Sequence, residues 1–376
     1  MRSQNLNKYS PESIPPPGDT ILDYLDSYGW TQKELALRTD LTPKTISEIC
    51  SGKAPISPTT ALALEKVFQR PAHFWLSLQS LFDEFLARSA VAKKAVSWSD
   101  WLSKFPIKEM QRCKYFEELE GTENDVSRLL EFFGVSSPVG WNSIWKTTNV
   151  AFRQTSKFDR SEEAMSAWVR ATEVFANRLE SEIEVRDFNS RQLKELIPEI
   201  RRQTLKKVDK AVPNVQDLCA TVGIIFVLVP ELSKTGISGC TRWLSETKVI
   251  VALTLRHKRD DIFWFTFFHE LGHVLLHKKA CRFVLDNAAE SLNDKIVDLP
   301  MASLEEEANR FAADTLIDPD ALFEFIKMGD YSPEALEKFA RKQEIAPGIV
   351  VGQLQHLGVI QRNQGNMFKQ TLDWAF

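Results

Sequence analysis

The sequence predicts a mainly α-helical chain that also contains one small β-sheet, an α+β fold. Most of the 376 residues show apolar side chains at helical spacing, with capping residues ahead of the apolar runs. Between residues 224 and 253 the pattern changes to short β-branched runs that end at turn residues, which is typical of strands. A helical pattern returns after residue 260, and the length suits two or three domains.

Residues 19–88 are expected to form five helices, following a flexible proline-rich tail over residues 1–18. Each helix is preceded by a residue that can cap or open it. These residues are Asp19, Thr31, Thr42, Ser57 and Pro71. Glu34 completes a capping box with Thr31, and the fifth helix is expected to run to about Arg88.

Residues 89–212 are expected to be a helical linking region rich in tryptophan. Its tryptophans form either a recognition surface or a buried core, and we favour the core because large aromatic side chains are mostly buried. They are Trp98, Trp101, Trp141, Trp145 and Trp168. From Pro213 onward we expect three strands and then two longer helices. The strands are expected at 224–229, 236–244 and 249–253, and the helices at 263–276 and 304–317.

The apolar run from Phe263 to Leu276 contains the sequence His-Glu-Leu-Gly-His. Its histidines, His269 and His273, are four residues apart, so their Cβ atoms lie about 5–6 Å apart on one helix face. Two such imidazoles can bind one Zn²⁺ ion, and Glu270 between them can act as general base toward a water on the metal. The alternative is a pair of hydrogen-bonded core histidines, which we favour less because buried histidines without partners are costly.

A catalytic zinc site needs a third protein ligand, and the helix expected at 304–317 begins with three glutamates. At about 100° per residue, Glu306 points away from the apolar stripe of that helix. Glu305 is nearer the centre of the stripe than Glu307 and shares a face with Asn309. We therefore expect Glu305 to be the ligand and Asn309 to be a partner of a ligating histidine. His277, one turn beyond the motif, is the rival ligand.

Composition excludes several classes of protein. The formal net charge of −4 gives the whole chain no basic field that would attract nucleic acid or an anionic membrane. The five cysteines are far apart and form no CxxC pair, which indicates reduced thiols and a cytoplasmic location. We expect no signal peptide and no membrane-spanning helix. Cys240 is expected to be a small buried residue, although a redox latch that blocks the open zinc position is the alternative.

Two separated motifs resemble the ImmA/IrrE metallopeptidase family. One is the segment 263–273, and the other is Glu305 followed by Ala308-Asn309 and Phe311-Ala312. The resemblance covers about residues 213–376 and implies a gluzincin-like zinc metallopeptidase domain over that range. It further implies a zinc endopeptidase with His269, His273 and Glu305 as ligands and Glu270 as base. Characterised family members cleave repressors. Residues 346–354 are similar to the C-terminal segment of the family, but the family commonly has an arginine where this chain has Gln353, which weakens the expectation that this segment binds substrate.

Residues 19–88 resemble the XRE/HigA-type helix-turn-helix, mainly through the segments 31–36 and 41–46 and through Gly52-Lys53. The resemblance implies a DNA-binding domain whose second motif helix enters the major groove. The residues expected to face base edges are Lys44, Thr45 and Glu48. The residues expected to contact phosphates are Gln32, Thr42 and Lys53. Residues 19–88 hold seven Lys/Arg against nine Asp/Glu, so one copy should bind phosphate weakly and a homodimer is the expected reader of DNA.

Together the resemblances imply a DNA-binding transcriptional regulator of antitoxin or repressor type that carries a zinc-dependent endopeptidase domain. The expected partners are an operator with an inverted repeat and a toxin or repressor protein as substrate. The alternative is a non-catalytic HigA-like antitoxin in which the zinc domain is structural or a sensor. A closed fourth coordination position would favour that alternative. A free strand edge beside His269 would favour a peptidase, because peptidases often bind substrate by adding a strand.

Overall fold

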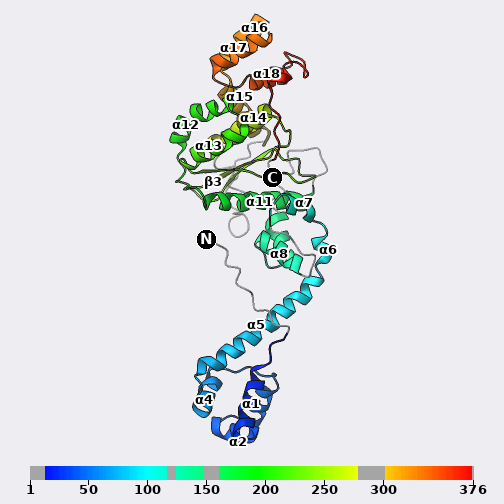
Figure 1. Ribbon diagram of the computed structural model, residues 1–376, viewed down its shortest axis with the longest axis vertical. Helices are drawn as coiled ribbons and strands as arrows, with labels where there is room; N and C mark the ends of the chain where they lie inside the picture. Colours follow the sequence, from blue (N-terminus) through cyan, green and yellow to red (C-terminus); the bar gives the residue numbers. More distant parts are fainter. Residues whose placement is uncertain (1–12, 117–123, 147–160, 278–300, 375–376) are drawn as a thin grey trace. The chain divides into compact units, whose positions relative to one another are not determined.

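The computed structural model describes residues 13–116, 124–146, 161–277 and 301–374, and it divides into two compact units over residues 1–98 and 99–376. Helices predominate, and the described residues contain one three-stranded sheet, which confirms the predicted fold class (Figure 1). The predicted domain limits at residues 18, 88 and 212 stay predictions. No helix among the described residues is both long enough and apolar enough to cross a lipid bilayer.

The first unit contains five helices around a small apolar core. They are α1 (Pro17–Tyr28), α2 (Gln32–Thr39), α3 (Pro43–Cys50), α4 (Pro58–Phe68) and α5 (Ala72–Val96). The side-chain oxygens of Thr31, Thr42 and Ser57 accept hydrogen bonds from the backbone N–H three residues on, so these three predicted caps are confirmed. Leu35 and Trp75 are fully buried in the core.

The first helix begins earlier than predicted. Its N-cap is Pro16, with no side-chain hydrogen bond, whereas Asp19 lies inside the first turn. Gly18 is buried against the end of α3, where a Cβ atom would lie 2.3 Å from the carbonyl oxygen of Ile49. The close approach of α1 and α3 therefore requires glycine, and the segment that the sequence assigned to a flexible tail begins to pack at Pro17.

The second unit opens with a series of helices before the sheet. They are α6 (Ser99–Leu102), α7 (Ile107–Arg112), α8 (Asn124–Phe133), α9 (Pro138–Trp141), the π-helix η1 (Asn142–Lys146), α11 (Glu162–Glu180), α12 (Ser190–Arg202), the 3₁₀ helix η2 (Gln203–Leu205) and α13 (Val208–Ala220). Four of the five tryptophans singled out above are buried, with Trp98 half-buried, which confirms the core interpretation. Pro213, where a new domain was predicted to begin, lies inside α13.

The sheet has the order β1–β3–β2, with β1 (Ile224–Leu228), β2 (Gly239–Trp243) and β3 (Val249–Leu253). β1 pairs with β3 in parallel, and β2 pairs with β3 antiparallel. All three predicted strands are present, although β2 is shorter than the predicted range 236–244. Because β3 is central, it is buried along its whole length, whereas β2 forms one edge.

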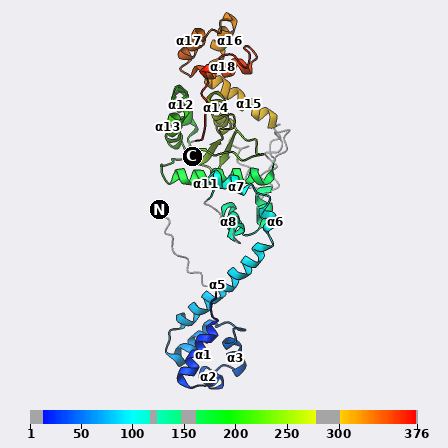
Figure 2. The ribbon, with the colours of Figure 1, turned by 45° about the vertical axis from the view of Figure 1, so that its right-hand side comes forward.

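Helices cover both faces of the sheet. The helix α11 lies along one face, and α13 and α14 (Asp260–Leu276) lie along the other, as two views show (Figures 1 and 2). On the second face, Val249 and Val251 share one apolar core with Phe267 and Phe268 of α14. The alternate β3 residues, including Ile250, are buried toward α11. The packing of α14 on the sheet fixes the position of the helix and its rotation about its own axis.

The remaining helices follow α14 in sequence. They are α15 (Met301–Leu316), α16 (Pro319–Met328), α17 (Pro333–Gln343), α18 (Pro347–His356) and the 3₁₀ helix η5 (Asn366–Phe368). α15 packs along α14, and α18 contacts α14 as well. The last described residues return to the start of α14, where Arg259 and Thr371 form an isolated β-bridge. The last described residues therefore pack against the first turn of α14.

Two adjacent carboxylates lie at the start of α14 in different environments. Asp261 is paired with Arg259 and with the buried ammonium of Lys369. Asp260 accepts hydrogen bonds from the backbone N–H of Gln370 and of Asp261 through Oδ1, each at 2.9 Å. Its Oδ2 is buried and has no hydrogen-bond partner among the described residues. Burial raises the pKa of Asp260 to about 6.

The raised pKa of Asp260 predicts a pH dependence of stability. The folded state binds this proton more tightly than the unfolded state, so the stabilisation is complete below about pH 4 and is lost as pH rises through about 6. Asp260→Asn keeps the Oδ1 acceptor and removes the charge. We expect it to be more stable than wild type by about 1–3 kcal/mol at pH 8 and by little at pH 4.

Urea unfolding of the full chain at pH 4, 6 and 8 measures this effect. Asp217→Asn on α13 is the matched control, because Asp217 is exposed. A gap between Asp260→Asn and wild type that stays constant across the three pH values would contradict the prediction.

Candidate metal centre and DNA-binding face

α14 presents two histidines on the face that turns toward α15. The Nε2 atoms of His269 and His273 are 3.0 Å apart, and both side chains are largely buried. The opposite face of the same helix carries Phe263, Phe267 and Phe268, which are fixed in the core beneath it. The helical spacing and the buried aromatic face together aim both imidazoles at one point.

Glu305 on α15 reaches the same point. Its Oε2 lies 3.3 Å from His269 Nε2, and its Oε1 lies 3.5 Å from His273 Nε2. One ligand atom from each of the three side chains lies within 4.8 Å of the others. Two imidazole nitrogens and one carboxylate oxygen are a donor set that zinc binds in catalytic sites, so the residues present fit a zinc ion. Glu306 is exposed, and Glu307 makes a different contact.

The close approach of α15 depends on a glycine in the motif. A Cβ atom at Gly272 would lie 3.1 Å from a ring carbon of Phe311 and 3.2 Å from the Cα of Ala308. Ala308 is fully buried, and its backbone carries Glu305 one turn earlier on the same helix. Small residues at the crossing thus set the distance between the helix with the two histidines and the helix with the glutamate.

Asn309 fixes the ring of the first histidine. Its side-chain Oδ1 lies 2.9 Å from Nδ1 of His269, so Nδ1 donates and Nε2 is left with a free lone pair. Burial lowers the pKa of His273 to about 4. This shift favours the neutral imidazole, the form that binds metal.

Glu270 lies between α14 and the strand β2. Its side chain is buried, and Thr241 donates a hydrogen bond of 2.7 Å to its Oε2. A Cβ atom at Gly239 would lie 2.7 Å from Oε1 of Glu270, so only glycine leaves room for the carboxylate. Burial raises the pKa of Glu270 to about 7, which suits a group that takes up a proton at neutral pH.

Among the described residues, β2 has an unpaired backbone edge beside Glu270. Hydrogen bonds join Thr254 N–H to Ser238 O and Leu244 N–H to Lys248 O. In this antiparallel register, the backbone N–H and C=O groups of the even-numbered residues of β2 therefore face β3. The backbone groups of Gly239 and Thr241 therefore point away from the sheet, and within the described part of the chain they have no hydrogen-bond partner. An added strand can bind at this position.

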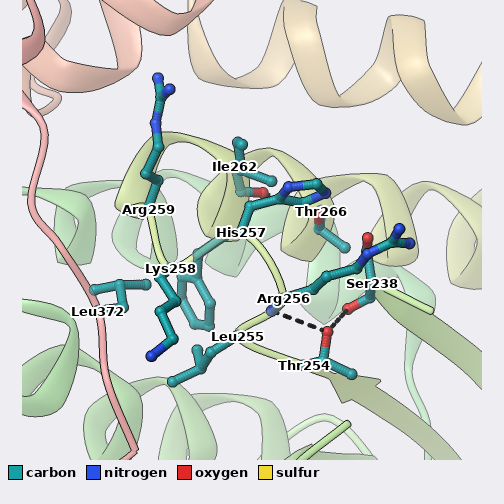
Figure 3. Close-up of a pocket in the computed structure, with 11 residues that line it drawn as sticks. Ser238, Thr254, Leu255, Arg256, His257, Lys258, Arg259, Ile262, Thr266 and Leu372 are labelled. Atoms are coloured by element: carbon teal, nitrogen blue, oxygen red, sulfur yellow. Dashed lines mark hydrogen bonds between the residues drawn. The ribbon is translucent and has the colours of Figure 1, made fainter. Parts of the chain in front are cut away.

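A shallow pocket continues this edge toward the start of α14 (Figure 3). The loop between β3 and α14 forms one wall, where the backbone N–H of Arg256 and the carbonyl of Ser238 contact the Thr254 hydroxyl. Thr266 lines the pocket and also lies beside Gly239, one turn before Glu270. Thr266 therefore lies between the pocket and Gly239, the residue that packs against the candidate base.

Cys240 lies on the other face of β2. Side chains alternate along a strand, and Gly239 and Thr241 face Glu270, so Cys240 and Arg242 face α11, where Arg242 pairs with Glu173. Cys240 is buried there. This confirms the expectation of a small buried residue. The thiol lies on the face of β2 opposite to Glu270, so it does not suit the role of a redox latch at the metal site.

The first unit presents the N-terminus of α3 at its surface. Lys44 is largely exposed and lies 3.8 Å from Glu48, and Thr45 is hydrogen-bonded to Thr42 through both side-chain oxygens. Lys53 is exposed just after α3, and Gln32 is half-buried at the start of α2. The six predicted DNA-contact residues thus lie on α2, on α3 or in the adjoining loops. Ser47 is also exposed and lies at helical spacing from Lys44 on the same face of α3.

Sequence profiles of two families match the chain. The profile described as "Helix-turn-helix" matches residues 21–75, within the first unit. The profile described as "IrrE N-terminal-like domain", a peptidase family, matches residues 242–346, a range that includes α14 and α15 with all the candidate metal-site residues.

Two curated proteins and one solved structure match a part of the chain. The chain is 35% identical over 66 residues to the "Uncharacterized HTH-type transcriptional regulator YddM" of Escherichia coli (strain K12), which is 18% of this chain and 70% of the relative. It is 40% identical over 70 residues to "Virulence-associated protein A'" of Dichelobacter nodosus, covering 18% of this chain and 61% of the relative. A solved addiction module antidote protein of a HigA family from Coxiella burnetii is 27% identical, covers 22% of this chain and 92% of its own, and has a TM-score of 0.21.

Proposed function

Because the chain belongs to the helix-turn-helix family of transcriptional regulators and carries an IrrE N-terminal-like domain, we propose that it is a DNA-binding regulator with a zinc-dependent endopeptidase domain. The regulator is of antitoxin or repressor type, and its endopeptidase domain cleaves a regulatory protein. The observation that carries the peptidase part is the free edge of β2, because Gly239 and Thr241 flank the buried carboxylate of Glu270 there.

The chemistry follows from the residues around Glu270. His269, His273 and Glu305 are the proposed ligands of zinc, which supplies Lewis acidity to a water molecule and to the scissile carbonyl. Glu270 takes the proton of the attacking water and later donates it to the leaving amine. Thr241 holds the carboxylate by its hydrogen bond, so that Oε1 stays available for the proton. The substrate binds as an extended strand along β2, which places its backbone beside Glu270.

The proposed substrate is a repressor or toxin protein that is cleaved within an extended segment, since β2 binds backbone and not a folded surface. The test compares new protein N-termini in a bacterial lysate after incubation with the zinc-loaded wild type and with Glu270→Gln. Termini that appear only with wild type identify substrates. A lysate in which wild type generates none favours the alternative, a HigA-like antitoxin whose zinc domain is structural or a sensor.

DNA binding is expected to require a homodimer at an inverted repeat, with half-sites about one helical turn apart. Lys44→Ala should relax base preference and weaken specific binding by about 1–3 kcal/mol if Lys44 contacts a guanine edge. Lys53→Ala should weaken binding to all sequences alike and reduce the salt slope by about one unit. A binding titration over a salt series, with the promoter of its own gene and a random duplex, measures both effects.

Two variants serve as controls for the DNA titration. Lys66→Ala on α4 removes an exposed lysine outside the predicted face and should leave the affinity unchanged. Glu270→Gln should also bind DNA as wild type does, because Glu270 lies in the other unit. Equal wild-type affinity for the promoter and for the random duplex would mean that the helix-turn-helix is a protein-interaction module.

A further inference from the structure

A third histidine lies behind the candidate metal centre. His277 ends α14, one turn after His273, and its side chain is almost fully buried. Its Nδ1 lies 3.0 Å from Nδ1 of His273, and its Nε2 lies 3.0 Å from Oε2 of Glu307. His277 therefore touches the nitrogen of His273 that faces away from Glu305, so its position does not suit the role of rival metal ligand.

The three side chains admit one proton arrangement when His273 binds a metal. His273 Nε2 faces the ligand position, so its proton must lie on Nδ1 and is donated to Nδ1 of His277. His277 must then accept at Nδ1 and carry its own proton on Nε2. That proton is donated to the carboxylate of Glu307. Each hydrogen bond in the row thus fixes the tautomer of the next ring.

We propose that His277 and Glu307 are positioning residues that hold His273 in its metal-binding tautomer and ring orientation. This proposal rests on the proposed metal site. A histidine that binds a metal through one ring nitrogen generally donates the N–H of the other to a carboxylate, carbonyl or water. Here the ring of His277 lies between His273 and the carboxylate of Glu307. His269 is held differently, by the neutral amide of Asn309.

The side chain of His277 is not needed to end the helix. The C-cap bond of α14 runs from the backbone N–H of His277 to the carbonyl of His273, which any residue other than proline can make. Glu306 beside Glu307 provides a matched comparison, because it is exposed on the same turn of α15. Substitutions at 277 and 307 therefore test the hydrogen-bonded row rather than the helix end.

The test measures Zn²⁺ affinity of the full chain by competition with a chromophoric chelator. His277→Leu removes the acceptor and should weaken zinc binding by about 10- to 100-fold. His277→Gln offers an amide oxygen to His273 and should recover most of that loss. Glu307→Ala should weaken binding by less than His277→Leu, and Glu306→Ala should leave it unchanged.

A second measurement is independent of affinity. Nitrogen-15 NMR of the zinc-loaded wild type should show His273 protonated at Nδ1 and His277 protonated at Nε2. A proton on Nδ1 of His277 would overturn the proposal. Because the measurement uses the wild-type protein, it does not depend on whether a variant folds. His277→Leu and Glu307→Ala could both bind zinc as tightly as wild type while His273→Ala loses zinc. That result would overturn the positioning role of His277 and Glu307 but would still support the metal site. Failure of wild type to bind zinc would instead overturn the proposed function and the positioning role with it.

Discussion

Replacing Glu270 with glutamine is expected to reduce substrate cleavage by about 10²- to 10⁴-fold, the usual contribution of a general base. Glutamine keeps the size of the side chain and still accepts the hydrogen bond from Thr241, so the contact with β2 survives. It cannot take a proton from water, so the chemical step slows while substrate binding is retained. The measurement is kcat and KM on a peptide that spans a cleavage site found in the lysate comparison.

The variant should affect kcat and leave KM and zinc content near wild type. Thr241→Val is the matched control for the surroundings of Glu270, because it removes the hydrogen bond and leaves the carboxylate. It should reduce kcat by less than Glu270→Gln does. Unchanged kcat in Glu270→Gln would show that this carboxylate is not the base.

Removing either ligating histidine is expected to abolish stoichiometric zinc binding. Purified wild type should hold about one zinc per chain, because three donor atoms meet at one point. His269→Ala and His273→Ala should each lose most of it. Glu305→Gln should weaken zinc binding more than Glu307→Gln, because Glu305 faces both Nε2 atoms and Glu307 faces His277. Elemental analysis after dialysis against a weak chelator gives the metal content.

Removal of zinc provides the complementary control. A strong chelator should stop cleavage by wild type, and added Zn²⁺ should restore it, whereas the histidine variants should not recover. Full zinc retention by the His269→Ala/His273→Ala double variant would rule out this site. A larger loss in Glu307→Gln than in Glu305→Gln would move the third ligand to Glu307.

Features that depend on neighbours in sequence could be predicted. The caps at Thr31, Thr42 and Ser57 follow from local hydrogen bonding between a side chain and a backbone N–H three residues on. The placement of His269 and His273 on one helix face follows from the helical repeat. The choice of Glu305 among three glutamates used the same rule, applied to the apolar stripe of α15, and the structure places its carboxylate beside both histidines.

Features that depend on distant segments could not be predicted. Thr241 and Gly239 touch Glu270 only because β2 is an edge strand that lies against α14, and strand order cannot be obtained from a local pattern. The partner of His277 depends on how α15 crosses α14. The N-cap of α1 was placed three residues late, at Asp19 instead of Pro16, because the packing of Gly18 against α3 outweighs a capping preference at Asp19.

Gly272 makes the metal centre sensitive to a residue that has no side chain. A methyl group there would lie 3.2 Å from the Cα of Ala308, a backbone atom that can move only with its helix. α15 would have to retreat by a few tenths of an ångström, and Glu305 would retreat with it. Metal–ligand distances vary by only about 0.2 Å. The two variable positions of the His-Glu-Leu-Gly-His segment are therefore not equivalent. Gly272, the fourth residue of the segment, sets the distance between the two histidines on α14 and Glu305 on α15.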